Sequence, residues 1–97
     1  MTGGVRLDLN FRDFQEQLFD LDAGELRQAV KTLRKVSRLT WQQVYADQGL
    51  KWEELRSAKG RFTIRVTRQC RAVVSRDGVF ICFLALHFDH DGAYGSG

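Results

Sequence analysis

The sequence predicts an α+β domain in which helices pack on a small, mainly antiparallel, twisted sheet. Apolar side chains recur at spacings of three and four residues in the first half of the chain, as in amphipathic helices. After Gly60 the period changes to two, as in strands. A length of 97 residues allows one domain with one small core. We therefore expect residues 1–97 to form a single domain, with residues 95–97 as a flexible tail.

The chain is expected to begin with one strand and a short helix. Residues 5–9 alternate apolar and polar side chains, which is typical of a half-buried strand. Asn10 is placed to cap the helix that follows. The apolar positions of that helix are Phe11, Phe14, Leu18 and Leu21.

A second helix is predicted from Asp22 to about Arg38. Asp22 and Glu25 have the spacing of a capping box at its start. Its apolar face consists of Leu26, Ala29, Val30, Leu33 and Val36. Its basic residues are Arg27, Lys31, Arg34, Lys35 and Arg38. Such a basic face is either a solvated outer surface or a track for RNA phosphates.

A third, shorter helix is predicted after Thr40. Thr40 and Gln43 again have capping-box spacing, and Gly49 suits the left-handed residue that ends a helix. Bulky residues in and after this segment are expected to cover the sheet: Trp41, Val44, Leu50, Trp52 and Leu55. We interpret the two tryptophans as core or partner-groove residues rather than as platforms for stacked bases.

Three strands are expected in the last third of the chain. Residues 62–66 alternate apolar side chains with Thr63 and Arg65, and the next strand spans residues 70–76. Asp77-Gly78 is a strong tight-turn signal, so this strand should pair antiparallel with residues 79–86. The latter run is apolar on both faces, which predicts the central strand, covered on both sides.

Composition narrows the class of protein. The chain is 43% hydrophobic and 28% charged, as globular proteins are. No apolar run approaches the roughly 18 residues of a membrane span, and the N-terminus lacks the layout of a secretory signal. We therefore expect a cytoplasmic protein with no membrane partner. Cys70 and Cys82, which have no CxxC spacing, are expected to be reduced core residues.

Charge is distributed unevenly along the chain. Residues 1–50 hold seven basic and seven acidic residues, which cancel. Residues 51–76 hold eight basic residues against two acidic ones, a balance of +6. A basic field of this size favours a polyanion or an acidic protein as the partner.

The end of the last strand carries the residue types of a proton-transfer site. Both histidines belong to the polar cluster His87-Phe88-Asp89-His90-Asp91, and Tyr94 follows close behind. Arginines beside such a strand end could hold a phosphate while a histidine moves a proton. Asp89 and Asp91 add carboxylates, so a divalent cation is a competing ligand. Neighbouring residues alternate in direction along a strand, however, so we expect no functional metal site and no cofactor.

On these residues the chain resembles the RelE/ParE superfamily of toxins from type II toxin–antitoxin systems. The resemblance covers nearly the whole chain in size and element order. It depends on residues 62–66, residues 70–74, the Asp77-Gly78 hairpin, the apolar strand and the polar segment that ends in Tyr94. It implies a RelE-like β-α-α-(α)-β-β-β order with helices packed on the sheet.

The resemblance also implies roles for individual residues. Arg71 matches the arginine that RelE-like ribonucleases hold against the scissile phosphate. Tyr94 falls where these toxins carry a terminal tyrosine, and both histidines fall where relatives place an arginine or a histidine. The expected catalytic residues are Arg71, His90, Tyr94 and His87. The expected RNA-binding or phosphate-binding residues are Arg65, Arg61, Arg68, Lys31 and Arg34.

The function favoured by these observations is cleavage of mRNA on the ribosome by a toxin that a cognate antitoxin holds inactive. Such cleavage is metal-independent, because the ribose 2′-OH itself attacks the neighbouring phosphorus. Two alternatives stay open: a ParE-like toxin that binds DNA gyrase, and a non-catalytic interaction protein with the same fold. The histidine–tyrosine–arginine set favours cleavage, whereas Asp89 and Asp91 favour the alternatives.

Overall fold

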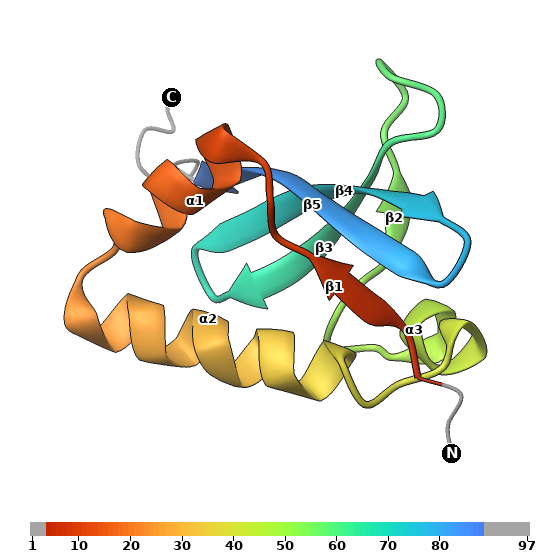
Figure 1. Cartoon of the computed structure of the whole chain (residues 1–97), viewed down its shortest axis with the longest axis horizontal. Coiled ribbons are helices and arrows are strands. Elements are labelled where there is room, and N and C mark those ends of the chain that lie inside the picture. Colours follow the sequence, from red (N-terminus) through yellow and green to blue (C-terminus); the bar gives the residue numbers. More distant parts are fainter. Residues whose placement is uncertain (1–3, 89–97) are drawn as a thin grey trace.

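The computed structural model describes residues 4–88, in which three helices and five strands form an α+β fold (Figure 1). In chain order the elements are β1 (Arg6–Asp8), α1 (Arg12–Phe19), α2 (Ala23–Val36), α3 (Trp41–Ala46), β2 (Glu53–Glu54), β3 (Phe62–Thr67), β4 (Cys70–Asp77) and β5 (Phe80–Phe88). The α+β class and the predicted order of elements are confirmed. The two-residue strand β2 was not predicted.

The five strands form one sheet in the order β1-β5-β4-β3-β2. The pairs β2–β3, β3–β4 and β4–β5 are antiparallel, and only β1 runs parallel to its neighbour β5. The sheet is therefore mainly antiparallel, as predicted. The prediction that residues 79–86 form the central strand was wrong: β4 is the middle strand, and β5 lies between it and β1. The apolar character of β5 reflects its internal position and its contact with α1.

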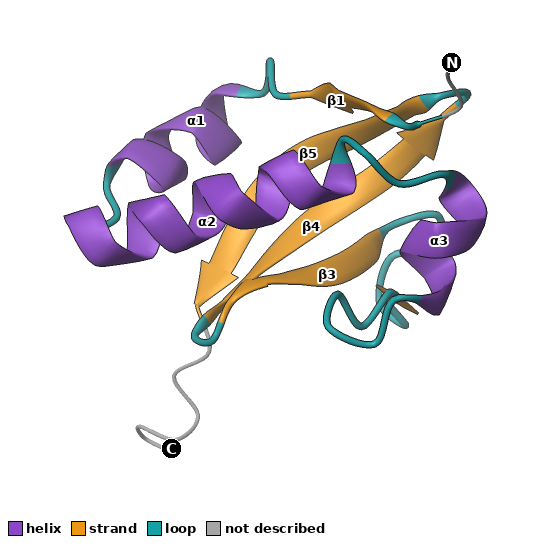
Figure 2. Ribbon diagram, turned by 90° about the horizontal axis from the view of Figure 1, so that it is seen from below, coloured by secondary structure: helices purple, strands orange, loops and turns teal. Residues whose placement is uncertain are grey.

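Helices α1 and α2 cover one face of the sheet (Figure 2). The ring of Phe14 on α1 lies 5.2 Å from that of Phe83 on β5, and both side chains are fully buried. Residues Ala29, Leu33 and Val36 of α2 are buried in the same cluster. Burial of this apolar surface is the main favourable term in folding. None of the described helices is long and apolar enough to cross a membrane.

The ends of the helices follow the predicted capping only in part. Thr40 and Gln43 form the predicted capping box of α3. Asp22 accepts a hydrogen bond from the backbone N–H of Glu25, but the Glu25 carboxylate accepts one from Thr67 of β3 instead of returning to α2. Asn10 caps nothing: the N-cap of α1 is Phe11, and it makes no side-chain bond.

Two turns place the strands that carry the site. Gly78, with φ of 62°, is the first of two residues between β4 and β5, as in a type II′ hairpin turn. The indole N–H of Trp41 donates to the Gly78 carbonyl at 2.9 Å and so ties α3 to this hairpin. After α3, the left-handed residue is Lys51, with φ of 53°, rather than the predicted Gly49.

Candidate functional site

Three of the predicted site residues stand side by side on neighbouring strands. Arg65 of β3 pairs with Arg71 of β4, and Arg71 pairs with His87 of β5. Directly opposed residues of antiparallel strands have Cα atoms about 4.5–5.5 Å apart. The sheet therefore aligns two arginines and one histidine from three neighbouring strands in one Arg–Arg–His row.

The Arg–Arg–His row lies on the sheet face that points away from α1 and α2. Ile64 and Ala72, which precede Arg65 and follow Arg71 in their strands, are fully buried in the core beneath the helices. Successive side chains of a strand point to opposite faces, so both arginines point away from that core. Both are half-buried, and His87 is exposed.

His87 reaches this face because of an irregularity in β5. The register shifts between Val73 and Val74 of β4, which leaves Leu84 as one extra residue in β5. Phe83 points into the core, so strict alternation would turn His87 towards the helices as well. The extra residue reverses the alternation and places the imidazole beside the arginines.

A pocket of about 240 Å³ lies on this face and includes two members of the row. We call it the sheet pocket. Its lining consists of Leu55, Thr63, Arg71, Val73, His87 and Phe88. The segment that carries Leu55 belongs to the loop between β2 and β3, which projects beyond the sheet (Figure 1). A cation, a histidine and a hydroxyl thus share one small cavity with apolar walls, which suits a phosphate ester attached to an apolar group.

Arg65 turns away from the sheet pocket towards the edge of β3. One of its guanidinium N–H groups donates to the Arg68 carbonyl at 2.9 Å. Arg65 and Arg68 line a second cavity of about 460 Å³ between α2 and β3, which we call the edge pocket. Its lining consists of Gln28, Lys31, Thr32, Lys35, Gly49, Leu50, Arg65, Val66, Thr67 and Arg68.

The predicted phosphate-binding residues therefore divide into separate groups. Arg65, Arg68 and Lys31 meet in the edge pocket. Arg34 is exposed on α2 and Arg61 is exposed immediately before β3, and neither lines either pocket. His90 and Tyr94 lie outside the described residues 4–88.

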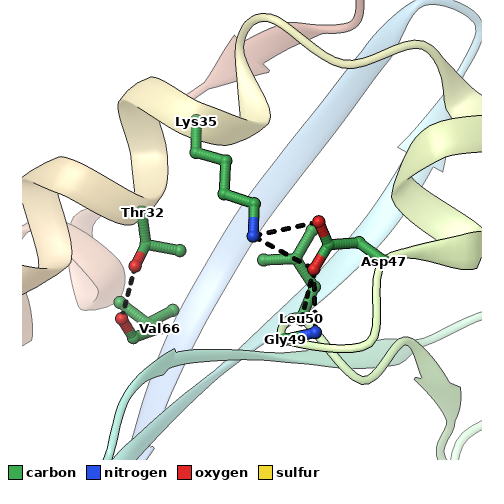
Figure 3. A network of polar contacts seen from close by, with 6 residues as sticks. All are labelled: Thr32, Lys35, Asp47, Gly49, Leu50 and Val66. Atoms are coloured by element: carbon green, nitrogen blue, oxygen red, sulfur yellow. Dashed lines mark hydrogen bonds and ion pairs between the residues drawn. The ribbon is translucent and has the colours of Figure 1, made fainter.

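Sequence reasoning missed the acidic residue that organises the edge pocket. The Asp47 carboxylate contacts the Lys35 ammonium at 2.9 Å and accepts hydrogen bonds from the backbone N–H groups of Gly49 and Leu50 at 2.8 and 3.0 Å (Figure 3). The hydrogen bond from Lys35 is the main cause that holds the pKa of Asp47 below its ordinary value. The spacing of Asp47 to Gly49 is that of an Asx turn, which is the signal that could have identified it.

Four residues that line the sheet pocket were not predicted as site residues: Leu55, Thr63, Val73 and Phe88. The period-two pattern of β3 was the available signal for Thr63, because it places Thr63 on the face of Arg65. The position of Leu55 depends on the path of the loop before β3, which the sequence pattern does not predict.

The tryptophans pack in an aromatic cluster at the other end of the sheet. Trp52 stacks on Phe62 with ring centroids 4.5 Å apart, and Trp41 stacks on Tyr45 at 5.7 Å. The Arg76 guanidinium lies 4.4 Å from the Trp41 ring centroid. These contacts agree with the interpretation of both tryptophans as packing residues.

Both cysteines are free and buried, as predicted. Burial raises the pKa of the Cys70 thiol to about 11, and the nearby Glu25 carboxylate acts in the same direction. Burial also raises the pKa of Cys82. Neither thiol is therefore poised as a nucleophile at neutral pH.

Comparison with solved structures identifies the class of proteins that share this fold. No protein-family model matches the chain, and no curated protein matches its sequence. Solved structures do match. The RelE toxin in the RelB–RelE antitoxin–toxin complex from Methanococcus jannaschii superposes with a TM-score of 0.61 at 10% identity, over 96% of this chain and 100% of that one.

Two further solved structures share this fold. The YoeB/ParE toxin from Agrobacterium tumefaciens gives a TM-score of 0.60 at 20% identity, over 86% of this chain and 96% of that one. A conserved hypothetical protein from Helicobacter pylori gives 0.60 at 20% identity, over 87% and 93%. The chain has the fold of the RelE-, YoeB- and ParE-type toxins of toxin–antitoxin systems, and the resemblance drawn from its last third is confirmed at the level of the fold.

Proposed function

We propose that this protein is the toxin of a type II toxin–antitoxin system and that it cleaves mRNA on the ribosome at the sheet pocket. The observation that carries the proposal is the pairing of Arg71 with His87 in one pocket of a RelE-like sheet. A fold alone does not define a function, so the proposal depends on these side chains.

Arg71 has the position and the charge to bind the scissile phosphate. During cleavage the ribose 2′-oxygen bonds to phosphorus, and the bond from phosphorus to the 5′-oxygen of the next nucleotide breaks. The phosphorane that forms between these events carries extra negative charge on its equatorial oxygens. A guanidinium can donate two parallel hydrogen bonds to those oxygens.

His87 is placed to transfer a proton in the same step. One group must accept the proton of the 2′-OH, and another must donate a proton to the departing 5′-oxygen. We assign His87 one of these roles. We assign the other to His90 or Tyr94, which follow β5 in the sequence. The products are a 2′,3′-cyclic phosphate and a 5′-OH, so atoms and protons balance without a metal.

We further propose that a cognate antitoxin binds this protein. The M. jannaschii RelE structure is that of an antitoxin–toxin complex. On this chain, Phe19 of α1 is 71% exposed and Val30 of α2 is 49% exposed. Large apolar side chains on the outer surface of helices are suitable anchors for an amphipathic segment of a partner.

The proposal is tested by inducing the protein in bacteria and mapping the 5′ ends of cellular RNA. New ends within translated codons, together with arrested growth that co-expressed antitoxin relieves, are the expected result. Unchanged mRNA with a DNA-damage response would replace it with the gyrase-binding alternative. Unchanged mRNA and normal growth would leave the non-catalytic interaction protein.

A further inference from the structure

The edge pocket has a charge and a composition that the sheet pocket does not explain. Four basic side chains line it: Lys31 and Lys35 from α2, Arg65 from β3, and Arg68 from the turn that follows β3. Two carboxylates are close by: Asp47 pairs with Lys35, and Glu25 bonds to Thr67. The balance of these six groups is positive by two charges.

Most of the donors in the edge pocket are free to bind a ligand. Lys31 and Arg68 make no ion pair among the described residues, and both are exposed. Arg65 donates one N–H to the Arg68 carbonyl. A guanidinium has five N–H groups, so others can still donate to a ligand. Lys35 is already oriented by Asp47, so its ammonium stays at the pocket without further ordering (Figure 3).

The walls of the edge pocket are fixed by hydrogen bonds between separate elements. The Thr32 hydroxyl of α2 donates to the Val66 carbonyl of β3 at 2.7 Å. The backbone N–H of Arg65 donates to the Leu50 carbonyl, also at 2.7 Å. These bonds fasten α2 and the segment after α3 to the same edge of β3. The cations therefore face a preformed cavity rather than a flexible surface.

One register pair of the sheet links the strands that line the edge pocket and the sheet pocket. Arg65, which lines the edge pocket, is directly opposite Arg71, which lines the sheet pocket. A polynucleotide carries one phosphate per nucleotide, so one strand that passes around the edge of β3 can place phosphates in both pockets. The geometry points to a second phosphate site: we propose that the edge pocket binds the RNA backbone beside the phosphate held at Arg71. This inference rests on the proposed function.

Binding of a single-stranded deoxyribonucleotide, which lacks the 2′-OH and so is not cut, tests the edge pocket apart from catalysis. The double variant Lys31→Gln/Arg68→Gln should bind roughly 3- to 20-fold more weakly in fluorescence anisotropy. Its slope of log affinity against log salt should fall by about 1.4, because each lost phosphate contact removes about 0.7 for single strands.

The matched control is Arg27→Gln/Arg38→Gln. It removes the same charge from exposed residues on or next to α2 that line neither pocket. This control variant should weaken binding by less than about three-fold, because it changes only the long-range electrostatic field. Equal losses in the two double variants, at equal melting temperature, would overturn the edge pocket as a site. So would a poly-glutamate peptide that binds with the same affinity and the same dependence on Lys31 and Arg68.

The two proposals fail separately. A protein that cuts RNA while both double variants bind alike retains the proposed function and loses the edge pocket. A protein that cuts no RNA but binds the oligonucleotide through Lys31 and Arg68 loses the proposed function and retains the edge pocket as a polynucleotide site.

Discussion

At the scale of residues, the proposed chemistry depends on Arg71 and His87, which the sheet sets opposite each other on neighbouring strands. Composition and periodicity distinguish neither side chain; only the resemblance to RelE-like toxins marks them as expected site residues. Arg71 is one of eight basic residues within residues 51–76, and His87 follows a run of apolar residues. Their shared pocket distinguishes them, because the same phosphate can contact both.

Arg71→Ala should abolish most of the RNA cleavage without unfolding the protein. Loss of one preformed donor to a charged transition state typically costs about 10²–10³-fold in rate. Arg71 is half-buried and forms no ion pair among residues 4–88, so melting temperature should change little. Cleavage assays should show Arg27→Ala, at an exposed position on α2, to be as active as wild type. Wild-type rates for Arg71→Ala would contradict the phosphate assignment.

His87→Gln should slow cleavage by about 10²-fold, since glutamine can hydrogen-bond but cannot exchange a proton at neutral pH. His87 is exposed, so the folded state should tolerate the change. The decisive reading is the pH–rate profile of the variant. If His87 transfers a proton, one limb of the wild-type profile disappears; a slower variant with an unchanged profile shows that the imidazole serves only to position the substrate.

At the scale of elements, the loop of residues 47–50 is held by one carboxylate. Asp47 binds two backbone N–H groups and the Lys35 ammonium, and its side chain is only 20% exposed. The loop in turn supplies the carbonyl of Leu50 that bonds to the edge of β3. The loop thus connects α2, α3 and the sheet through a single side chain.

Asp47→Ala should lower the free energy of unfolding at neutral pH by about 1–2 kcal/mol, since charge-assisted hydrogen bonds are lost. The pKa of Asp47 is lowered in the folded state, so the folded state prefers the carboxylate. Its contribution is present above the unfolded pKa, near 3.9 for Asp, and is lost as pH falls through the lower folded pKa. Urea denaturation should therefore separate wild type and variant at pH 7, and the difference should begin to shrink below about pH 4 and disappear only below the lower folded pKa. A difference that persists at acid pH would show that the carboxylate charge is not involved.

Elements were predicted better than their irregularities. Alternation in residues 62–66 and the turn at Gly78 were sufficient to identify β3, β4 and β5. The extra residue at Leu84, which turns His87 towards Arg71, has no signature in an unbroken apolar run. The Glu25 carboxylate bonds to Thr67 rather than completing its capping box, since a tertiary partner was available. Both outcomes are decided by contacts between distant parts of the chain.

At the scale of the whole molecule, one cluster of buried apolar residues fastens α1 and α2 to one face of the sheet, and the sheet pocket lies on the opposite face. The parallel pairing of β1 with β5 joins residues more than 70 positions apart, and no local pattern predicts it. The alignment of Arg65, Arg71 and His87 in one row could not be predicted from the sequence either, because it depends on the register of three strands at once.

Cys70 gives a probe of this whole-molecule packing. Its side chain is fully buried and its pKa is raised to about 11, so both access and ionisation oppose reaction. In the native protein at pH 8, alkylation of Cys70 should proceed only through unfolding and should accelerate in parallel with urea-induced loss of structure. Peptide mapping by mass spectrometry would measure it. Labelling of Cys70 faster than global unfolding would show that the β3–β4 end of the sheet opens locally.

The central claim is that Arg71 and His87 form one site that cuts RNA by attack of the 2′-OH. The most direct measurement is an end-group assay of mRNA incubated with purified protein and translating ribosomes. The account predicts fragments with 5′-OH and 2′,3′-cyclic phosphate ends for wild type, and their near loss for Arg71→Ala and His87→Gln. Intact mRNA with the wild-type protein, or cuts that both variants make equally well, would contradict it.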